Sequence, residues 1–167
     1  MNMDWKRLAR HLWIGKPERD RIFPKASLER ITAAIAAAEI KHHGEIRFAV
    51  QSSLHASEVL RGVGARQKAI EAFAHLGVWD TEANNGVLIY LLLADRDVEI
   101  VADRGVHAKV GDKGWEAICG KMEAEFRAGR FEAGVLDGIA EVGRHLETHF
   151  PRRGDDVNEL PDEPVML

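Results

Sequence analysis

The segment Asn84–His107, NNGVLIYLLLADRDVEIVADRGVH, contains the strongest strand patterns in the chain. Val87–Leu93 is an unbroken apolar run that follows the turn residues Asn85 and Gly86, and such a run is typical of a strand buried on both faces. After a short polar connection, Val98–Ala102 predicts a second, antiparallel strand. We therefore predict that Val87–Leu93 is the central strand of a sheet.

Sequence patterns on either side of this segment alternate between helix and strand. Apolar residues recur at helical spacing over Leu28–Ala38, and they alternate with more polar residues over Ile46–Gln51, which predicts a helix followed by a strand. Further helical patterns occupy Val59–Leu76, Trp115–Phe126 and Phe131–Leu146. This order predicts a single-domain α/β fold, a small mixed β-sheet covered by helices on both faces, with its first two strands parallel.

We divide the chain into an N-terminal extension, residues 1–22, a folded domain, residues 23–150, and an acidic C-terminal tail, residues 151–167. In the extension, Trp5–Ile14 has the pattern of a short amphipathic helix, with tryptophan and leucine on one side and basic residues on the other. Such a helix docks on its own domain or lies on an anionic membrane. The tail has the composition of a disordered segment. Leu160, between acids and prolines, also fits a docking segment for this domain or for a partner.

The composition, 46% apolar and 30% charged, is that of an ordinary soluble globular protein. A net charge of −4 argues against nucleic-acid binding, which depends on a basic surface. No run approaches the roughly 20 apolar residues of a transmembrane helix, and the N-terminus lacks the apolar core of a signal peptide. With Cys119 as the only cysteine, these features predict a reduced, cytoplasmic protein.

Candidate site residues follow the third predicted strand. Asp103 and His107 flank Gly105, and Asp112 comes shortly after them. Carboxylates and an imidazole at this spacing could hold a divalent cation, or serve as acid and base in phosphoryl chemistry. The same residues also fit a turn, in which Asp103 bonds backbone amides, Gly105 has a positive φ and Asp112 caps the next helix.

Asn85 and Glu45 complete the set of candidate binding residues. Asn85 opens the central strand, and Glu45 precedes the first strand, so that both could approach the same sheet edge as Asp103 and His107. For Glu45, the sequence favours a solvated surface acid, and a position at this sheet edge is the alternative. We therefore predict a binding site of Asp103, His107, Asn85 and Glu45, with Asp103, His107 and Asp112 as the metal ligands.

A series of motifs in this chain resembles the TPM domain, the domain of the thylakoid acid phosphatase and photosystem II repair proteins. The motifs are, in order, the strand start Asn85–Ile89, Asp95-Arg96, the strand Val98–Ile100, Gly105, Asp112 and the segment Phe126–Val135. Together they cover roughly residues 25–150. Where the usual member has Gly-Tyr-Gly, this chain has Asp103-Arg104-Gly105, and it resembles the short, free-standing bacterial branch with Asp-x-Gly-x-His at this place.

The resemblance implies two functions. The first is a non-catalytic protein-binding, assembly or quality-control module that binds calcium or another divalent cation, with a protein or a membrane-associated complex as its partner. The alternative is a metal-assisted acid phosphatase acting on phosphate esters. We favour the binding module, because the chain lacks a recognisable nucleophile.

Overall fold

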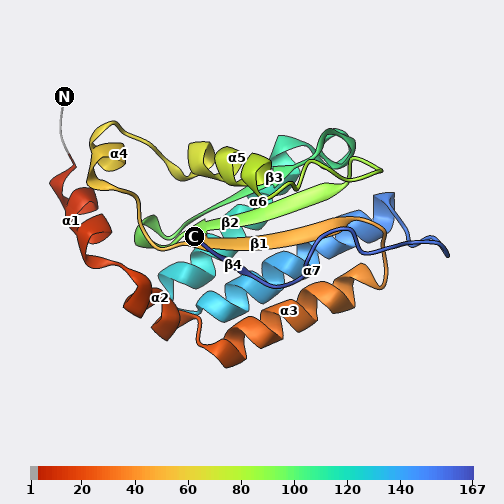
Figure 1. Cartoon of the computed structure of the whole chain (residues 1–167), viewed down its shortest axis with the longest axis horizontal. Helices are drawn as coiled ribbons and strands as arrows, with labels where there is room; N and C mark the ends of the chain where they lie inside the picture. Colours follow the sequence, from red (N-terminus) through yellow and green to blue (C-terminus); the bar gives the residue numbers. More distant parts are fainter. Residues whose placement is uncertain (1–3) are drawn as a thin grey trace.

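The computed structural model describes residues 4–167, so the first three residues of the predicted extension lie outside it. One four-stranded sheet has the order β3-β2-β1-β4 (Figure 1). Its strands are β1 (Glu45–Gln51), β2 (Gly86–Leu92), β3 (Asp97–Ala102) and β4 (Val165–Met166). The apolar run that the sequence analysis placed at the centre is thus β2, with a strand on either side.

Strand pairing confirms the predicted mixed sheet. β1 and β2 are parallel, with Glu45 opposite Gly86. β2 and β3 are antiparallel, with Val87 opposite Ala102, and the short strand β4 joins β1 in parallel. One end of the sheet therefore carries the start of β1, the start of β2 and the end of β3.

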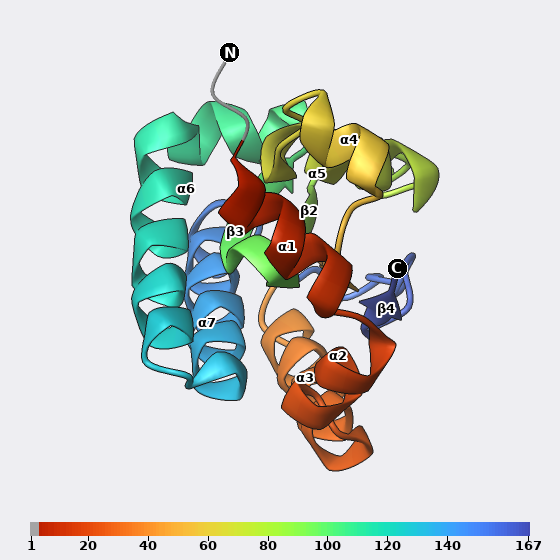
Figure 2. The ribbon, with the colours of Figure 1, turned by 90° about the vertical axis from the view of Figure 1, so that its left-hand side faces the viewer.

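Helices cover both faces of the sheet, as predicted for an α/β fold (Figures 1 and 2). α3, α6 and α7 pack on one face, while α5, α4 and part of α1 pack on the other. The helices are α1 (Trp5–Trp13), α2 (Lys16–Ile22), α3 (Lys25–Glu39), α4 (Ala56–Leu60), α5 (Ala65–His75), α6 (Arg104–Arg127) and α7 (Phe131–His149), with the short 3-10 turn η1 (Leu93–Asp95) after β2. None of the helices in residues 4–167 is both long and apolar enough to cross a membrane.

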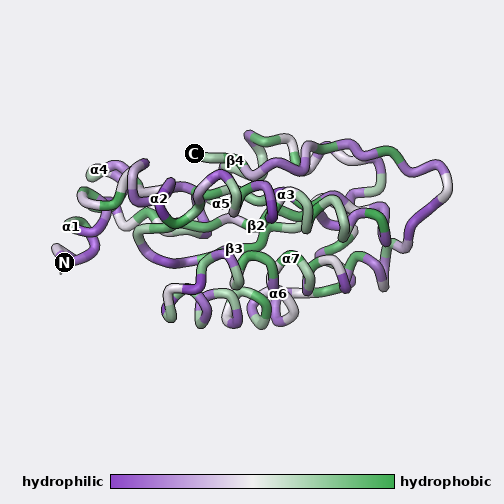
Figure 3. The backbone as a smooth tube through the Cα atoms, turned by 90° about the horizontal axis from the view of Figure 1, so that it is seen from below, coloured by the Kyte–Doolittle hydropathy of each residue, from purple (hydrophilic) through white to green (hydrophobic). Residues whose placement is uncertain are grey.

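The two core layers explain why β2 has no polar face. Val87, Ile89 and Leu91 belong to the cluster under α3, α6 and α7, and the alternate residues of the strand belong to the cluster under α5. Successive side chains of a strand point to opposite faces, so a strand covered on both sides needs an unbroken apolar run. Figure 3 shows this largely hydrophobic trace through the middle of the molecule.

Two helix predictions were wrong in detail. The segment Val59–Leu76 forms two helices, α4 and α5, because Gly62 has φ +74° and breaks the first after one turn. In the other prediction, the helix from Asp112 is present, but a further helical stretch that begins at Arg104 precedes it, and the two together form α6. Gly111, with φ +73°, kinks α6 immediately before the position where the sequence pattern placed its start.

The prediction of a disordered C-terminal tail was wrong. The tail returns along β1 and ends in β4, with Leu160 and Val165 packed against the cluster under α5. This agrees with the docking alternative, in which the tail binds its own domain. Its polar composition gave no sign of this contact, because Glu45 and Arg47 bind the backbone of the tail.

Candidate functional site

Three of the predicted binding residues lie at one end of the sheet. Glu45 starts β1, Asn85 directly precedes β2, and Asp103 directly follows β3. Glu45 donates its N–H to Asn85 O at 3.2 Å, and Asp103 donates its N–H to Gly86 O at 2.8 Å. The parallel and antiparallel pairings of β2 therefore bring together residues that are far apart in sequence.

The side chains of Asn85 and Asp103 connect this end of the sheet to its neighbours. Asn85 is fully buried, and its Nδ2 donates to His43 O at 2.8 Å. Asp103 is the N-cap of α6, where its Oδ1 accepts from the N–H of Arg104 at 2.7 Å. A carboxylate at a helix N-terminus is stabilised by the helix dipole. The turn interpretation of Asp103 thus agrees with the structure.

Gly105 has a different role from the one predicted. Its φ is not positive, since it lies in the first turn of α6. A Cβ at this position would lie 2.5 Å from Asn84 O and 3.2 Å from Ala83 O. Glycine is therefore needed here so that the start of α6 can approach the backbone of Ala83 and Asn84, which precede β2. This close approach holds Asp103, at the end of β3, beside Asn85 at the start of β2.

The predicted metal ligands do not form one site. His107 Nε2 lies 3.6 Å from Asp112 Oδ1, and both side chains are substantially exposed. These two residues line a groove of about 490 Å³ that does not include Asp103. Within residues 4–167, no three His, Cys, Asp or Glu side chains are grouped so that they could hold a metal ion. Because the trio is divided between a helix cap and a groove, its residues do not fit a three-ligand cation site.

The groove that contains His107 and Asp112 follows the free edge of the sheet, where β3 is the outermost strand. Ile100 lies opposite Ile89 of β2, but its carbonyl points away from β2 and accepts a hydrogen bond from Arg66 Nη1 at 2.9 Å. In an antiparallel pair, alternate residues direct their backbone groups away from the partner strand. Ile100 and its two alternate neighbours, Val98 and Ala102, therefore direct backbone N–H and C=O groups outward, and all three line the groove.

The other wall and the rim of this groove come from α6 and are acidic. Trp115 and Cys119 lie in the wall, and the groove's carboxylates outnumber its single guanidinium, that of Arg66. The carboxylates belong to Glu99, Asp112, Glu116 and Glu123. Burial raises the pKa of the adjacent Asp97 to about 6, and the charges of Glu123 and Glu99 add to that rise. The groove thus favours cationic ligands. Sequence patterns missed it, since its acids come from two elements.

Glu45 does not reach the groove, because it binds the C-terminal tail. Its carboxylate accepts from the backbone N–H of Glu159 at 3.0 Å and of Leu160 at 3.1 Å. Arg47, on the same strand, donates to the carbonyl oxygens of Pro161 and Glu163. Burial raises the pKa of Glu45 to about 7, although the two N–H donors oppose that rise. Two buried charged side chains of β1 thus bind the backbone of the tail.

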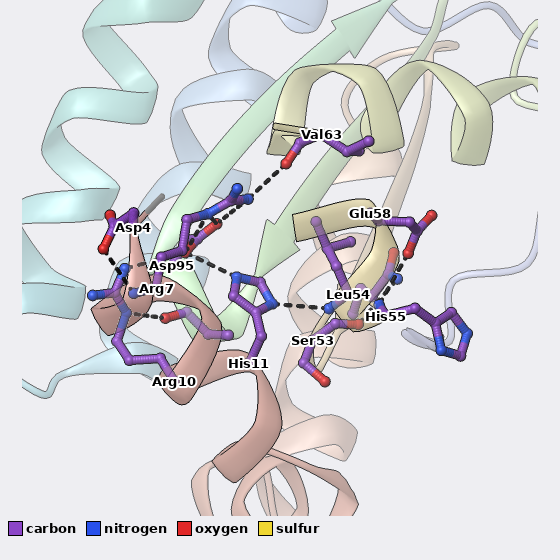
Figure 4. Close-up of polar contacts among 12 residues, drawn as sticks. Asp4, Arg7, Arg10, His11, Ser53, Leu54, His55, Glu58, Val63 and Asp95 are labelled. Carbon is purple, nitrogen blue, oxygen red and sulfur yellow. Dashed lines mark hydrogen bonds and ion pairs between the residues drawn. The ribbon is translucent and has the colours of Figure 1, made fainter. Parts of the chain in front are cut away.

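A second polar cluster, at the other end of β2, was not predicted. Asp95 accepts from Arg7 Nη2 at 2.9 Å and from His11 Nε2 at 3.0 Å, and it also pairs with Arg10 (Figure 4). His11 Nδ1 accepts from the N–H of Leu54 at 2.9 Å, so its proton lies on Nε2. Burial raises the pKa of Asp95, but the hydrogen bonds from Arg7 and His11 outweigh burial and lower it overall. The cluster fixes α1 on the domain through its basic side.

Comparison with known families adds to this geometry. The TPM domain family matches residues 18–145, which is more than half of the chain. The chain belongs to the TPM domain family. The resemblance drawn from the motifs around β2 and β3 is therefore confirmed.

Solved TPM-like structures share this fold. The NMR structure of the BA42 protein from the psychrophilic bacterium Bizionia argentinensis is 30% identical, with a TM-score of 0.75, and the match covers 85% of this chain and 93% of that one. The N-terminal domain of a P. gingivalis protein, 19% identical over 79% of this chain and 83% of its own, has a TM-score of 0.61 and shows the fold alone. No curated protein matches the chain.

The TPM match includes the sheet end and the groove but leaves out both ends of the chain. Residues 18–145 contain the strand ends and the groove beside β3. They exclude α1 and β4, which lie before and after the match. Asp95 binds α1, and Glu45 and Arg47 bind the tail. All three residues lie within the matched segment, whereas α1 and the end of the tail lie outside it.

Proposed function

We propose that this TPM domain is a non-catalytic protein-binding module whose ligand is an extended, positively charged segment in the groove between β3 and α6. The observation that carries the proposal is the outward direction of the backbone groups of Val98, Ile100 and Ala102 along an open groove. At Ile100 the N–H of an added strand would take the place of the Arg66 guanidinium, which now donates to the carbonyl. An extended segment can add to such an edge as a further strand, with main-chain hydrogen bonds providing affinity.

The charges of the groove support the cationic character of the ligand. Glu99 and Glu123 lie close enough to Asp97 for their negative charges to raise the pKa of Asp97. Lysine or arginine side chains placed between them would relieve this repulsion and add complementary charge. We expect binding to strengthen as the pH rises past about 6, where Asp97 becomes ionised.

A peptide titration followed by NMR tests the proposal. The probe is a short extended peptide of alternating lysine and valine, and the control peptide has glutamate in place of lysine. We expect the lysine peptide alone to shift the amide signals of Val98, Ile100 and Ala102. Equal shifts with both peptides, or shifts confined to other elements, would contradict the proposed site.

Gly120 offers a matched pair of variants, because it lines the groove and a Cβ there would meet no heavy atom within 4 Å. Gly120→Trp should fill the groove and weaken peptide binding by ~tenfold or more, since it removes space from the contact surface. Gly120→Ala should leave binding unchanged. Binding that survives Gly120→Trp in a folded protein would place the peptide elsewhere.

The phosphatase alternative and the divalent cation are tested in the same experiments. Of the three predicted metal ligands, His107 and Asp112 line the groove, where they could contact a cation or a phosphate ester. Hydrolysis of p-nitrophenyl phosphate, with and without calcium, is measured for the wild type and for His107→Ala. If the wild type hydrolyses the ester and His107→Ala does not, the phosphatase function would take the place of the proposed binding function.

We also propose a cytoplasmic location, which the lone Cys119 supports because the chain has no second cysteine for an internal disulfide. Burial raises the pKa of the Cys119 thiol to about 12, so that it stays protonated and unreactive at neutral pH. Fractionation of cells that express the protein tests this location, and recovery in a periplasmic or extracellular fraction would contradict it.

A further inference from the structure

The outer face of α1 is apolar, and no element within residues 4–167 covers it. Trp5 is 66% exposed, Leu12 71% and Trp13 90%. Ala9 lies between them in sequence and is also exposed. At 3.6 residues per turn, positions 5, 9, 12 and 13 share one side of a helix. Two tryptophans and a leucine therefore form one exposed apolar strip.

The inner side of α1 is held so firmly that this strip cannot turn inward. Leu8 and His11 are buried, and Arg7 and His11 both bond to Asp95 (Figure 4). Tryptophan and leucine were predicted to form the apolar side of this helix together, but only Leu8 of that group packs on the domain. The apolar strip instead faces outward, and Figure 2 shows α1 across one end of the molecule.

The distribution of charge distinguishes this end from the rest of the protein. Residues 1–23 contain six Lys or Arg and three Asp or Glu, and Asp95 adds one further carboxylate beside Arg7 and Arg10. This end therefore keeps more cations than anions, whereas the whole chain has a net charge of −4. Lys6 and Lys16 are exposed, and Arg10 keeps about half of its side chain accessible. A cationic end on an acidic body is attracted to an anionic surface at that end and repelled elsewhere.

We propose that the outer face of α1 is a peripheral membrane-binding surface that lies on bilayers rich in anionic lipid. Tryptophan rings settle at the boundary between headgroups and acyl chains, where the ring is buried and its N–H stays hydrated. Lys6, beside the strip, contacts the anionic headgroups, as its flexible chain allows. The helix is already folded on the domain, so binding costs no helix formation, unlike binding by a free peptide.

Co-sedimentation with vesicles tests this surface. The wild type is expected to bind vesicles of phosphatidylglycerol mixed with phosphatidylcholine, and to remain largely unbound with phosphatidylcholine alone. The double variant Trp5→Ser/Trp13→Ser should bind ~tenfold or more weakly, because it removes both interfacial anchors. Lys6→Ala should weaken binding about fivefold, and only on anionic vesicles.

Trp79→Ser is the matched control. Trp79 is 55% exposed and follows Val78, which contacts Gly86 at the start of β2, whereas α1 binds Asp95 beyond the end of that strand. It should bind vesicles like the wild type. If the wild type stays in the supernatant with anionic vesicles, the proposal is overturned. That result is the one expected if the outer face of α1 binds a protein. A folded double variant with undiminished binding, or an equal loss in Trp79→Ser, also overturns the proposal.

Discussion

Two glycines of α6 differ in what surrounds them, and this difference gives a prediction at the scale of single residues. Gly105→Ala should destabilise the protein by ~1–3 kcal/mol, because the new Cβ would lie 2.5 Å from the backbone oxygen of Asn84. Gly120→Ala, in the same helix, should stabilise it by ~0.5–1 kcal/mol, since no heavy atom lies within 4 Å. Urea unfolding measures both, and a neutral Gly105→Ala would contradict the close approach.

The candidate site shows how far single residues can be predicted from sequence. The sequence placed Glu45, Asn85 and Asp103 near one end of the sheet, because strand order and direction follow from the apolar pattern. The favoured interpretation of Glu45 as a solvated acid was wrong, since its side chain is buried. It could not decide what Asp103 does, since aspartate serves both helix caps and cations. Only the helix start at Arg104 shows that its carboxylate is a cap and that His107 faces a separate groove.

At the scale of elements, β2 is the strand on which the two core layers depend. Leu88 is fully buried in the layer under α5, so Leu88→Asp should prevent folding, because an unpaired buried carboxylate costs several kcal/mol or more. Ile70→Asp, on the half-exposed surface of α5, should leave the fold intact. Circular dichroism and hydrogen exchange distinguish the two variants. A soluble Leu88→Asp protein with native protection would contradict the role of β2.

β2 and the tail differ in how well the sequence predicted them. β2 was predictable within one residue, because an apolar run bounded by turns has few other structures open to it. The tail was not, since Glu45 and Arg47 bind its backbone and backbone contacts leave no pattern in side chains. The break between α4 and α5 needed a positive φ at Gly62, which a helical spacing of apolar residues does not reveal.

The contact of β1 with the tail should make stability depend on pH. The pKa of Glu45 rises from its ordinary value of 4.5 to about 7 in the folded protein, mainly through burial. The folded state therefore binds the extra proton between these values, and stability should fall as the pH rises through this window. Glu39, with a pKa raised by burial to about 9, should extend the decline to higher pH.

Glu45→Gln isolates the part of this decline that belongs to Glu45. Urea midpoints of the wild type should fall between roughly pH 5 and roughly pH 7, and those of Glu45→Gln should fall distinctly less. Glu163→Gln changes an exposed acid of the tail and should keep the wild-type slope. If Glu45→Gln and the wild type have the same slope, the buried carboxyl does not control the pH dependence.

At the scale of the whole molecule, Asp95 connects α1, which precedes the TPM match, to the core. It accepts hydrogen bonds from Arg7 and His11 with its side chain only 14% exposed. Asp95→Ala therefore leaves the buried Nε2–H of His11 without its acceptor and removes the carboxylate that pairs with Arg7, which keeps its bond to Val63 O. Loss of one partner from a buried ion pair costs ~3–5 kcal/mol. We expect this cost to appear mainly as local opening of α1, because α3, α6 and α7 form a core with the sheet that does not include α1.

Hydrogen exchange followed by mass spectrometry measures that opening. In Asp95→Ala, the amides of residues 8–13 should lose protection while those of β2 keep most of theirs. Asp137→Ala, an exposed acid on α7, is the control and should change neither segment. Equal loss of protection in α1 and β2 would mean that α1 and the sheet unfold together. In that case the cost of losing Asp95 would fall on the whole domain, and α1 would be an integral part of the fold and not a separately docked helix.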